Sequence, residues 1–167
     1  SECELVANEA QEEKGGGALF VAGGLVVLEQ RVHLRGNTAG GASNSIWLEK
    51  RGAIEYRLPA PRGHWINSFG QPSVQLAAGQ AYGDYPHPCA AGLDGSGESV
   101  EAQSTALCSG LCPEGLVCGA AATVAPHTCK RGGYCPTGSP AARPCPSRTF
   151  GNETGLVSAD GCRPCPP

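Results

Sequence analysis

Short apolar runs separated by Gly-containing corners mark the first third of the chain. Residues 19–21 and 46–48 are 27 positions apart, and residues 25–28 and 53–56 are 28 positions apart. A third run, residues 32–39, lies between the two copies and ends in a turn. Three short strands in a period of about 27 residues indicate coils of a parallel β-helix, in which each coil buries its apolar side against its neighbours.

The same apolar runs would also fit two unrelated hairpins of a β-sandwich, and the period alone does not decide between the two folds. We predict the β-helix, with terminal coils of the right-handed parallel form in this chain. Further coils are expected to precede Ser1, because two coils are too few for stability. The side chains expected to point largely inward are Leu19, Val21, Leu25, Val27, Ile46, Leu48 and Ile54. Since strand side chains alternate between two faces, some of this set must be wrong by one register.

The predicted coils end at Pro59 and Pro61, which remove two donors from any strand ladder. Trp65 follows and is expected to cover the open end of the stack. The composition then divides the chain into three parts. Residues 1–60 hold the coils, residues 61–105 form a cap and an irregular connecting segment, and residues 106–167 form a cysteine-rich module. The fold class is therefore mainly β.

Cysteine content indicates the compartment. Ten cysteines occur in 167 residues, and nine of them lie within residues 89–165. Such density is typical of small disulfide-linked domains in oxidising environments, so we expect a secreted or cell-surface protein. The net charge is −3 with scattered Lys and Arg, which argues against a nucleic-acid partner. The longest apolar stretch has 11 residues, 18–28, too few for a bilayer span of about 20.

Two loops of the module have the same form. Cys112 and Cys118 enclose five residues, as do Cys129 and Cys135, and each loop has a Gly three or four positions after its first cysteine. Residues 129–139, 144–150, 154–158 and 162–167 resemble the ephrin-receptor-like cysteine-rich repeats. These repeats occur in tandem in large extracellular proteins of algae and other protists, often after a pectin-lyase-like β-helix.

The resemblance implies an architecture of stacked modules that continues beyond Pro167, without shared catalytic residues. The chain departs from the repeat pattern at Ser147 and Arg148, where a Gly is usual, and a looser turn is expected there. Residues 58–61 resemble the end of the helix, and residues 84–92 resemble the connecting segment.

The eight cysteines from Cys89 to Cys162 allow 105 complete pairings, and spacing alone does not choose among them. Repetition of the two five-residue loops and the bounds of the repeat's turn favour one set. The expected disulfides are Cys112–Cys118, Cys129–Cys135, Cys145–Cys162 and Cys89–Cys108. Cys165 is expected to bond beyond Pro167, and Cys3 to bond upstream or to nothing in this chain.

Candidate catalytic and metal sites are sparse. Glycosidic cleavage usually needs a pair of carboxylates that act together. Residues 15–60 contain three scattered acids, Glu29, Glu49 and Glu55, and no Asp. Glu49 and Glu55 flank Lys50 and Arg51, which indicates a solvated, mutually compensating face. Cys162 and Cys165 have zinc-knuckle spacing, but no second pair completes four ligands. We therefore expect no catalytic residue, no metal and no cofactor in this chain.

Two asparagines have candidate roles. Asn152 begins the single Asn-Glu-Thr sequon, and we expect it to carry an N-linked glycan rather than to form an unmodified turn. Asn37 is expected to hydrogen-bond along the stack at a coil corner, rather than to bind a ligand.

Three classes of function fit these features. The leading interpretation is a non-catalytic structural segment of an extracellular filament or coat, which associates with itself or with other extracellular structural proteins and makes no direct membrane contact. The alternatives are a carbohydrate-active β-helix enzyme with its site upstream, and a receptor or adhesin ectodomain. A carboxylate cluster in preceding coils would favour the enzyme, and a following transmembrane helix would favour the receptor.

Overall fold

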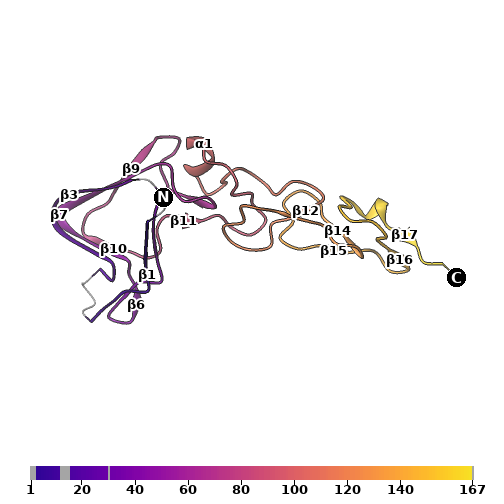
Figure 1. The fold of residues 1–167 in the computed structure, drawn as a ribbon, viewed down its shortest axis with the longest axis horizontal. Coiled ribbons are helices and arrows are strands. Elements are labelled where there is room, and N and C mark those ends of the chain that lie inside the picture. The colour runs from indigo at the N-terminus through magenta and orange to yellow at the C-terminus, as the bar shows by residue number, and fades with distance from the viewer. Residues whose placement is uncertain (1–2, 12–15, 30, 167) are drawn as a thin grey trace.

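The computed structural model describes residues 3–11, 16–29 and 31–166, and within them the fold is mainly β. Figure 1 shows an elongated molecule: the first strands form a broad body, and the cysteine-rich part extends from it as a narrow row of hairpins. The helical elements described are one four-residue α-helix, α1 (Val100–Gln103), and one 3-10 turn, η1 (Ala159–Gly161).

Three parallel strand pairs build the N-terminal body. β1 (Cys3–Val6) pairs with β4 (Val32–Arg35), and β2 (Glu9–Ala10) pairs with β5 (Thr38–Ala39). The longest pair joins β3 (Leu19–Leu28) to β7 (Ile46–Arg57), while the short β6 (Ala42–Ser43) folds back antiparallel on β5. Leu19 opposes Ile46 and Leu28 opposes Tyr56, the registers of 27 and 28 residues in which the apolar runs align.

A register shift between Val21 and Gly23 decides which side chains of β3 point inward. β7 has one more residue than β3 at this corner, so the inward positions of β3 change from odd to even numbers. The opposed inward pairs are Leu19 with Ile46, Val21 with Leu48, Val26 with Ile54 and Leu28 with Tyr56. The expectation that Leu25 and Val27 point inward is therefore wrong, since they are 57% and 37% exposed.

The core between these strands contains fully buried aliphatic and aromatic side chains. Ile46, Leu48, Ile54 and Tyr56 of β7 are fully buried with Leu34 of β4. The Tyr56 hydroxyl donates a hydrogen bond to the Val32 carbonyl, so the buried phenol has a polar partner. Burial of these apolar side chains is the main stabilising contribution to the body.

Asn37 forms hydrogen bonds to neighbouring segments of the N-terminal body, as expected, rather than facing a ligand site. Its side chain is fully buried, and its Oδ1 accepts from the backbone N–H and from the side-chain Nδ2 of Asn8, each at 2.9 Å. Its Nδ2 donates to the Leu5 carbonyl and to the Ser45 hydroxyl. The amide thus links residues 29 positions apart, and it has no capacity left for a ligand.

The outer edge of β7 is covered by two later strands. β9 (Ser73–Leu76) and β10 (Gln80–Tyr82) both pair with β7 in antiparallel orientation. These strands, rather than Trp65, cover the edge. Trp65 lies in β8 (His64–Trp65), which pairs with β11 (His87–Pro88) and places the Trp65 ring 5.0 Å from that of His87.

Three more hairpins, each of two-residue strands, follow along the row in Figure 1. β12 (Leu116–Val117) pairs with β13 (His127–Thr128), β14 (Gly133–Tyr134) with β15 (Arg143–Pro144), and β16 (Thr149–Phe150) with β17 (Arg163–Pro164). Strands this short bury little surface, so other contacts must hold the row together.

Candidate functional site: a ladder of disulfide-linked hairpins

One set of backbone contacts recurs five times between Gly63 and Cys165. We call the five segments hairpin units: residues 63–89, 92–112, 115–129, 132–145 and 148–165. Each unit begins with a residue of positive φ and ends with a cysteine. The N–H of that cysteine donates to the carbonyl of the unit's first residue, at distances from 2.8 to 3.3 Å.

A tight turn connects each unit to the next. Two residues separate every closing cysteine from the next first residue, as in Cys112-Pro-Glu-Gly115. The Leu116 N–H donates to the Pro113 carbonyl at 3.2 Å, which closes a turn around Gly115. A positive φ is needed at the third position of such a turn, and Gly adopts it without steric cost.

Arg148 holds this position in the fifth unit. Its φ is 65°, and the turn is closed by a 3.0 Å hydrogen bond from the Thr149 N–H to the Pro146 carbonyl. The sequence departure at Ser147 and Arg148 therefore leaves the turn intact. Because Arg148 has a side chain, its left-handed backbone conformation carries a steric cost on the order of 1–2 kcal/mol.

Backbone hydrogen bonds also join each unit to the following two. The first residue donates its N–H to the fourth residue of the next unit: Gly63 to Gly95, Gly92 to Cys118, Gly115 to Cys135 and Gly132 to Gly151. The carbonyl of a closing cysteine accepts from the unit after next: Cys89 from Ala122, Cys112 from Gly138 and Cys129 from Gly155. We call this continuous set of contacts the ladder; it depends on main-chain atoms and not on particular side chains.

Four disulfides reinforce the ladder, and they are the expected pairs: Cys89–Cys108, Cys112–Cys118, Cys129–Cys135 and Cys145–Cys162. Each joins a closing cysteine to the following unit. Where the fourth residue of that unit is a cysteine, as in Cys118 and Cys135, it is the partner. Where the fourth residue is Gly, the partner lies near the end of that unit instead.

Two cysteines lie outside these pairs. Cys165 is exposed and free. For Cys3, a bond upstream or to nothing in this chain was predicted, and its side chain lies outside the described ones. The four disulfides indicate folding in an oxidising environment.

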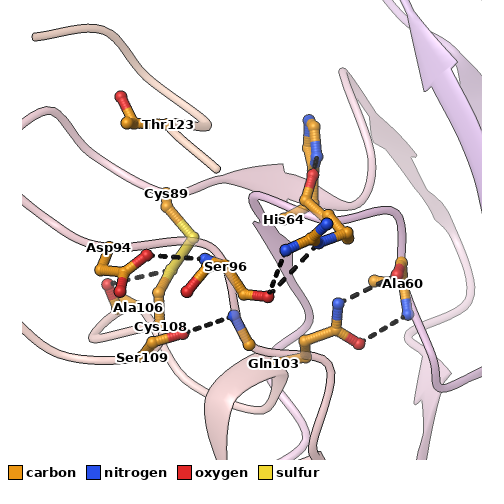
Figure 2. Close-up of a disulfide and its surroundings, with 12 residues drawn as sticks. Ala60, His64, Cys89, Asp94, Ser96, Gln103, Ala106, Cys108, Ser109 and Thr123 are labelled. Carbon is orange, nitrogen blue, oxygen red and sulfur yellow. Dashed lines mark hydrogen bonds between the residues drawn. A yellow bond between two sulfur atoms is a disulfide. The ribbon is translucent and has the colours of Figure 1, made fainter. Parts of the chain in front are cut away.

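The ladder begins against the N-terminal body at Ala60, which lies three residues before Gly63, where later units have a cysteine. Figure 2 shows Gln103 of α1 beside Ala60 and near the Cys89–Cys108 disulfide. Gln103 is 1% exposed; its Oε1 accepts from the Ala60 N–H and its Nε2 donates to the Ala60 carbonyl, both at 2.9 Å. The Gln103 Nε2 thus donates to the Ala60 carbonyl in the way that the Ala122 N–H donates to the Cys89 carbonyl.

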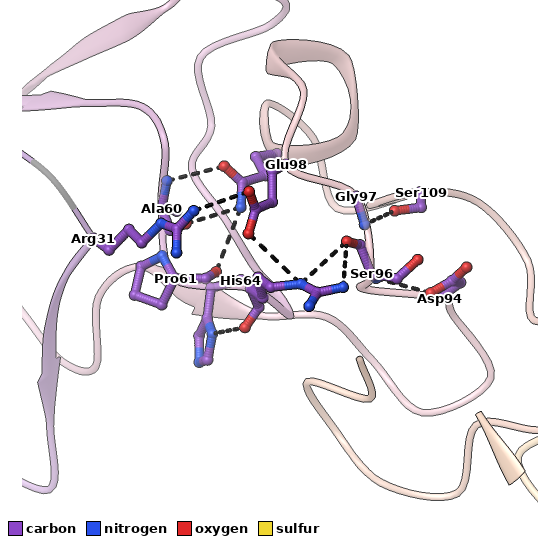
Figure 3. Close-up of polar contacts among 11 residues, drawn as sticks. Arg31, Ala60, Pro61, His64, Asp94, Ser96, Gly97, Glu98 and Ser109 are labelled. Atoms are coloured by element: carbon purple, nitrogen blue, oxygen red, sulfur yellow. Dashed lines mark hydrogen bonds and ion pairs between the residues drawn. The ribbon is translucent and has the colours of Figure 1, made fainter. Parts of the chain in front are cut away.

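Charged side chains surround this junction (Figure 3). Arg31 forms an ion pair of 2.9 Å with Glu98, and Arg62 donates to the Ser96 carbonyl at 3.1 and 3.3 Å. The Ser99 hydroxyl accepts from the Ala102 N–H and caps α1, which places Gln103. These contacts connect residues of the body with the loop of the second unit.

Two carboxylates of the body, Glu29 and Glu55, are bound by one arginine. Arg57 pairs with Glu29 at 2.6 Å and with Glu55 at 2.9 Å. Hydrogen bonding to Arg57 holds the pKa of Glu55 below its ordinary value. Compensation of Glu55 by Lys50 or Arg51 was expected, and Arg57 takes this role instead.

No group of three or more His, Cys, Asp and Glu side chains suited to a metal ion occurs in residues 3–11, 16–29 and 31–166. Over the same residues, no helix has the length and apolar character of a membrane span.

Asn152 follows β16, in the loop between that strand and η1. Its side chain is half-buried, and its Oδ1 has no hydrogen-bond partner among the described residues. Glu153 and Thr154, which complete the sequon, are exposed.

No protein-family model matches this chain, and comparisons with curated proteins and with solved structures give no match either. The functional inference therefore depends on the ladder and on the junction at Ala60.

Sequence reasoning placed the start of the cysteine module at residue 106, whereas the recurring contacts begin at Gly63. Unit length varies too much for cysteine-to-cysteine spacing to reveal the first two units. The constant interval is the one from a closing cysteine to the next Gly, visible at Cys89–Gly92, Cys112–Gly115 and Cys129–Gly132. The role of Gln103 has no signal in the sequence.

Proposed function

We propose that this chain is a non-catalytic structural segment of an extracellular or cell-surface filament or coat, in which it serves as a spacer and assembly module. The observation that carries the proposal is the ladder, in which main-chain hydrogen bonds and four disulfides connect five units in one row. A row of this kind holds two ends of a protein at a set separation without a large core.

The proposal includes two folds. Residues 1–60 would hold terminal coils of a right-handed parallel β-helix, a view supported by three parallel strand pairs with offsets of 27 to 29 residues. The hairpin units would be ephrin-receptor-like repeats, a view supported by the Cys-x-x-Gly interval and the shared disulfide pattern. Stacked coils and tandem units both extend in one direction, as a filament component requires.

The partners proposed are further copies of the chain or other extracellular structural proteins, and Asn152 would carry an N-linked glycan. The exposed position of Glu153 and Thr154 supports access for the transferase. A glycan there would lie on the row rather than on the N-terminal body.

Immunogold electron microscopy tests the proposal on cells that produce the protein. Antibodies against residues 115–165 are expected to label extracellular filaments or coat at regular spacing. Labelling confined to the cell interior, or diffuse release into the medium as a monomer, would contradict it. Assay of the purified protein on a panel of polysaccharides separates the structural interpretation from the carbohydrate-active one, because turnover would contradict a non-catalytic role.

A further inference from the structure

The hairpins share a side-chain pattern that the ladder does not require. In four units, the third residue is apolar or aromatic and lies directly across from a His or Arg. The opposed pairs are Trp65 with His87, Val117 with His127, Tyr134 with Arg143 and Phe150 with Arg163. These four units therefore present a cation or an imidazole beside a flat or apolar surface.

The cations of residues 106–167 are largely free of acids. Residues 106–167 contain five Lys and Arg but three Asp and Glu, whereas the remaining 105 residues contain seven and twelve. Lys130, Arg131, Arg143 and Arg148 are exposed and form no ion pair within the part of the chain that the structure describes. Arg163 alone of these five pairs with an acid, Glu153, at 3.1 Å.

A hollow of about 460 Å³ lies between the third and fourth units. Its lining combines apolar groups of Val117 and Ala142 with Lys130 and His127, and with Thr128. The small side chain of Ala142, the residue before Arg143, leaves this space open. The volume lies within the usual range of small-molecule sites, about 300–1,000 Å³.

We propose that this face binds an anionic polysaccharide, with one sugar ring in the hollow and its acidic substituent beside Lys130. Pyranose rings have apolar C–H faces that pack on Val117 and Ala142, and their sulfate or carboxylate groups are acceptors for Lys and Arg. Arg143 follows Ala142 and binds the next anionic group along the glycan. This site is additional to the proposed structural role, and it would anchor the row in an acidic extracellular matrix.

The chemistry of the hollow favours a saccharide over other polyanions. Nucleic acid binds where many cations follow a phosphate backbone or where several aromatic side chains stack on bases, whereas this hollow has one lysine and a single aromatic ring, the His127 imidazole. An acidic peptide would use the cations but not the apolar part of the lining, Val117 and Ala142.

Binding of the full chain to dextran sulfate and to alginate tests the site, with measurements in about 0.15 M NaCl, where exposed charges are screened beyond about 8 Å. The K130E/R143E double variant is expected to weaken binding at least tenfold. The matched control K50E/R51E makes the same charge change at a separate hollow of the body, which both cations line beside the acid Glu49, and is expected to weaken binding less than twofold. A142W fills the hollow without a charge change and is expected to weaken binding fivefold or more.

The two polysaccharides distinguish sulfate from carboxylate as the recognised group. Equal weakening by both double variants would overturn the site, since it would show attraction to net charge alone. Binding of oligo-dT or polyglutamate as tightly as either polysaccharide would overturn the choice of ligand. No binding to dextran sulfate or alginate would overturn the proposal without affecting the filament role, which immunogold labelling tests separately.

Discussion

The side-chain amide of Gln103 pairs with the backbone of Ala60 through two hydrogen bonds of 2.9 Å, one accepted by Oε1 and one donated by Nε2. At the end of the ladder that meets the body, a side-chain amide thus replaces a main-chain amide. Because both partners are buried, neither the N–H nor the carbonyl of Ala60 has water as an alternative partner.

Replacing Gln103 with Leu is expected to destabilise the fold strongly. The change preserves bulk but leaves the N–H and carbonyl of Ala60 without these partners, at a cost of about 2–4 kcal/mol. Urea unfolding monitored by tryptophan fluorescence measures it. The control Gln75→Leu alters an exposed residue of β9, and its effect should stay within about 0.5 kcal/mol. Equal effects of the two changes would refute a specific role for Gln103.

The register shift in β3 predicts opposite outcomes for two leucines. Leu28 is 8% exposed and Leu25 is 57% exposed. Leu28→Ala is expected to cost about 2–3 kcal/mol through lost packing and a residual cavity. Leu25→Ala should change stability by less than about 0.5 kcal/mol, since it lies on the surface. The reverse order in chemical unfolding would show that the strand is displaced by one residue.

Disulfides that close long loops are expected to contribute more stability than those that close short loops. Cys89–Cys108 spans 19 residues and Cys112–Cys118 spans 6. Chain-entropy arguments give about 3 kcal/mol for the longer loop and about 2 kcal/mol for the shorter one. Paired Cys→Ser variants, compared by guanidinium unfolding, measure both. Peptide mapping without reductant checks the pairing, and a Cys162–Cys165 bond would contradict it.

Asn152 is expected to carry one N-linked glycan when the protein is produced in a secretory pathway. Intact mass before and after glycosidase treatment should differ by one glycan, and Asn152→Gln should abolish that difference. Thr154→Ala is the matched test, because it removes the sequon and retains the asparagine. An unchanged mass in the parent protein would retire the prediction.

Burial of His87 predicts a loss of stability in acid. Desolvation holds the pKa of His87 below its ordinary value of 6.5, so the unfolded chain binds its proton more readily than the folded one. This contribution is present above pH 6.5 and is lost as the pH falls through the folded-state pKa. His87→Gln should therefore show a smaller drop in Tm between pH 7.5 and pH 5 than the parent. An identical drop in both proteins would exclude His87 as the cause.

The parallel pairing of β3 with β7 could be read from the sequence because two apolar runs of similar length recur at nearly constant spacing. The inward set could not be read in full, since the one extra residue in β7 lies at a corner of small and charged residues with no periodic signal. The same limit applies to the edge of β7. Trp65 has the size expected of a cap, whereas Ser73–Leu76 and Gln80–Tyr82 cover the edge with their main chain.

In the cysteine module, equal loop lengths identified the bonds at Cys112 and Cys129. The ladder itself was not predictable, because it joins main-chain atoms whose partners depend on tertiary placement rather than on residue type. Arg148 illustrates the difference: its side chain suggests a departure from the turn, while its backbone adopts the same positive φ as the glycines of the other units.

The four disulfides also set how far the row can be stretched. Their sequence separations of 19, 6, 6 and 17 residues cover more than half of the chain between Cys89 and Cys165, yet each bond holds its two Cα atoms 5.9 to 6.1 Å apart. In a reduced chain those stretches would extend to about 170 Å at about 3.5 Å per residue. Under tension the oxidised row can extend only through the residues outside these loops, and reduction would release the length that the four bonds withhold.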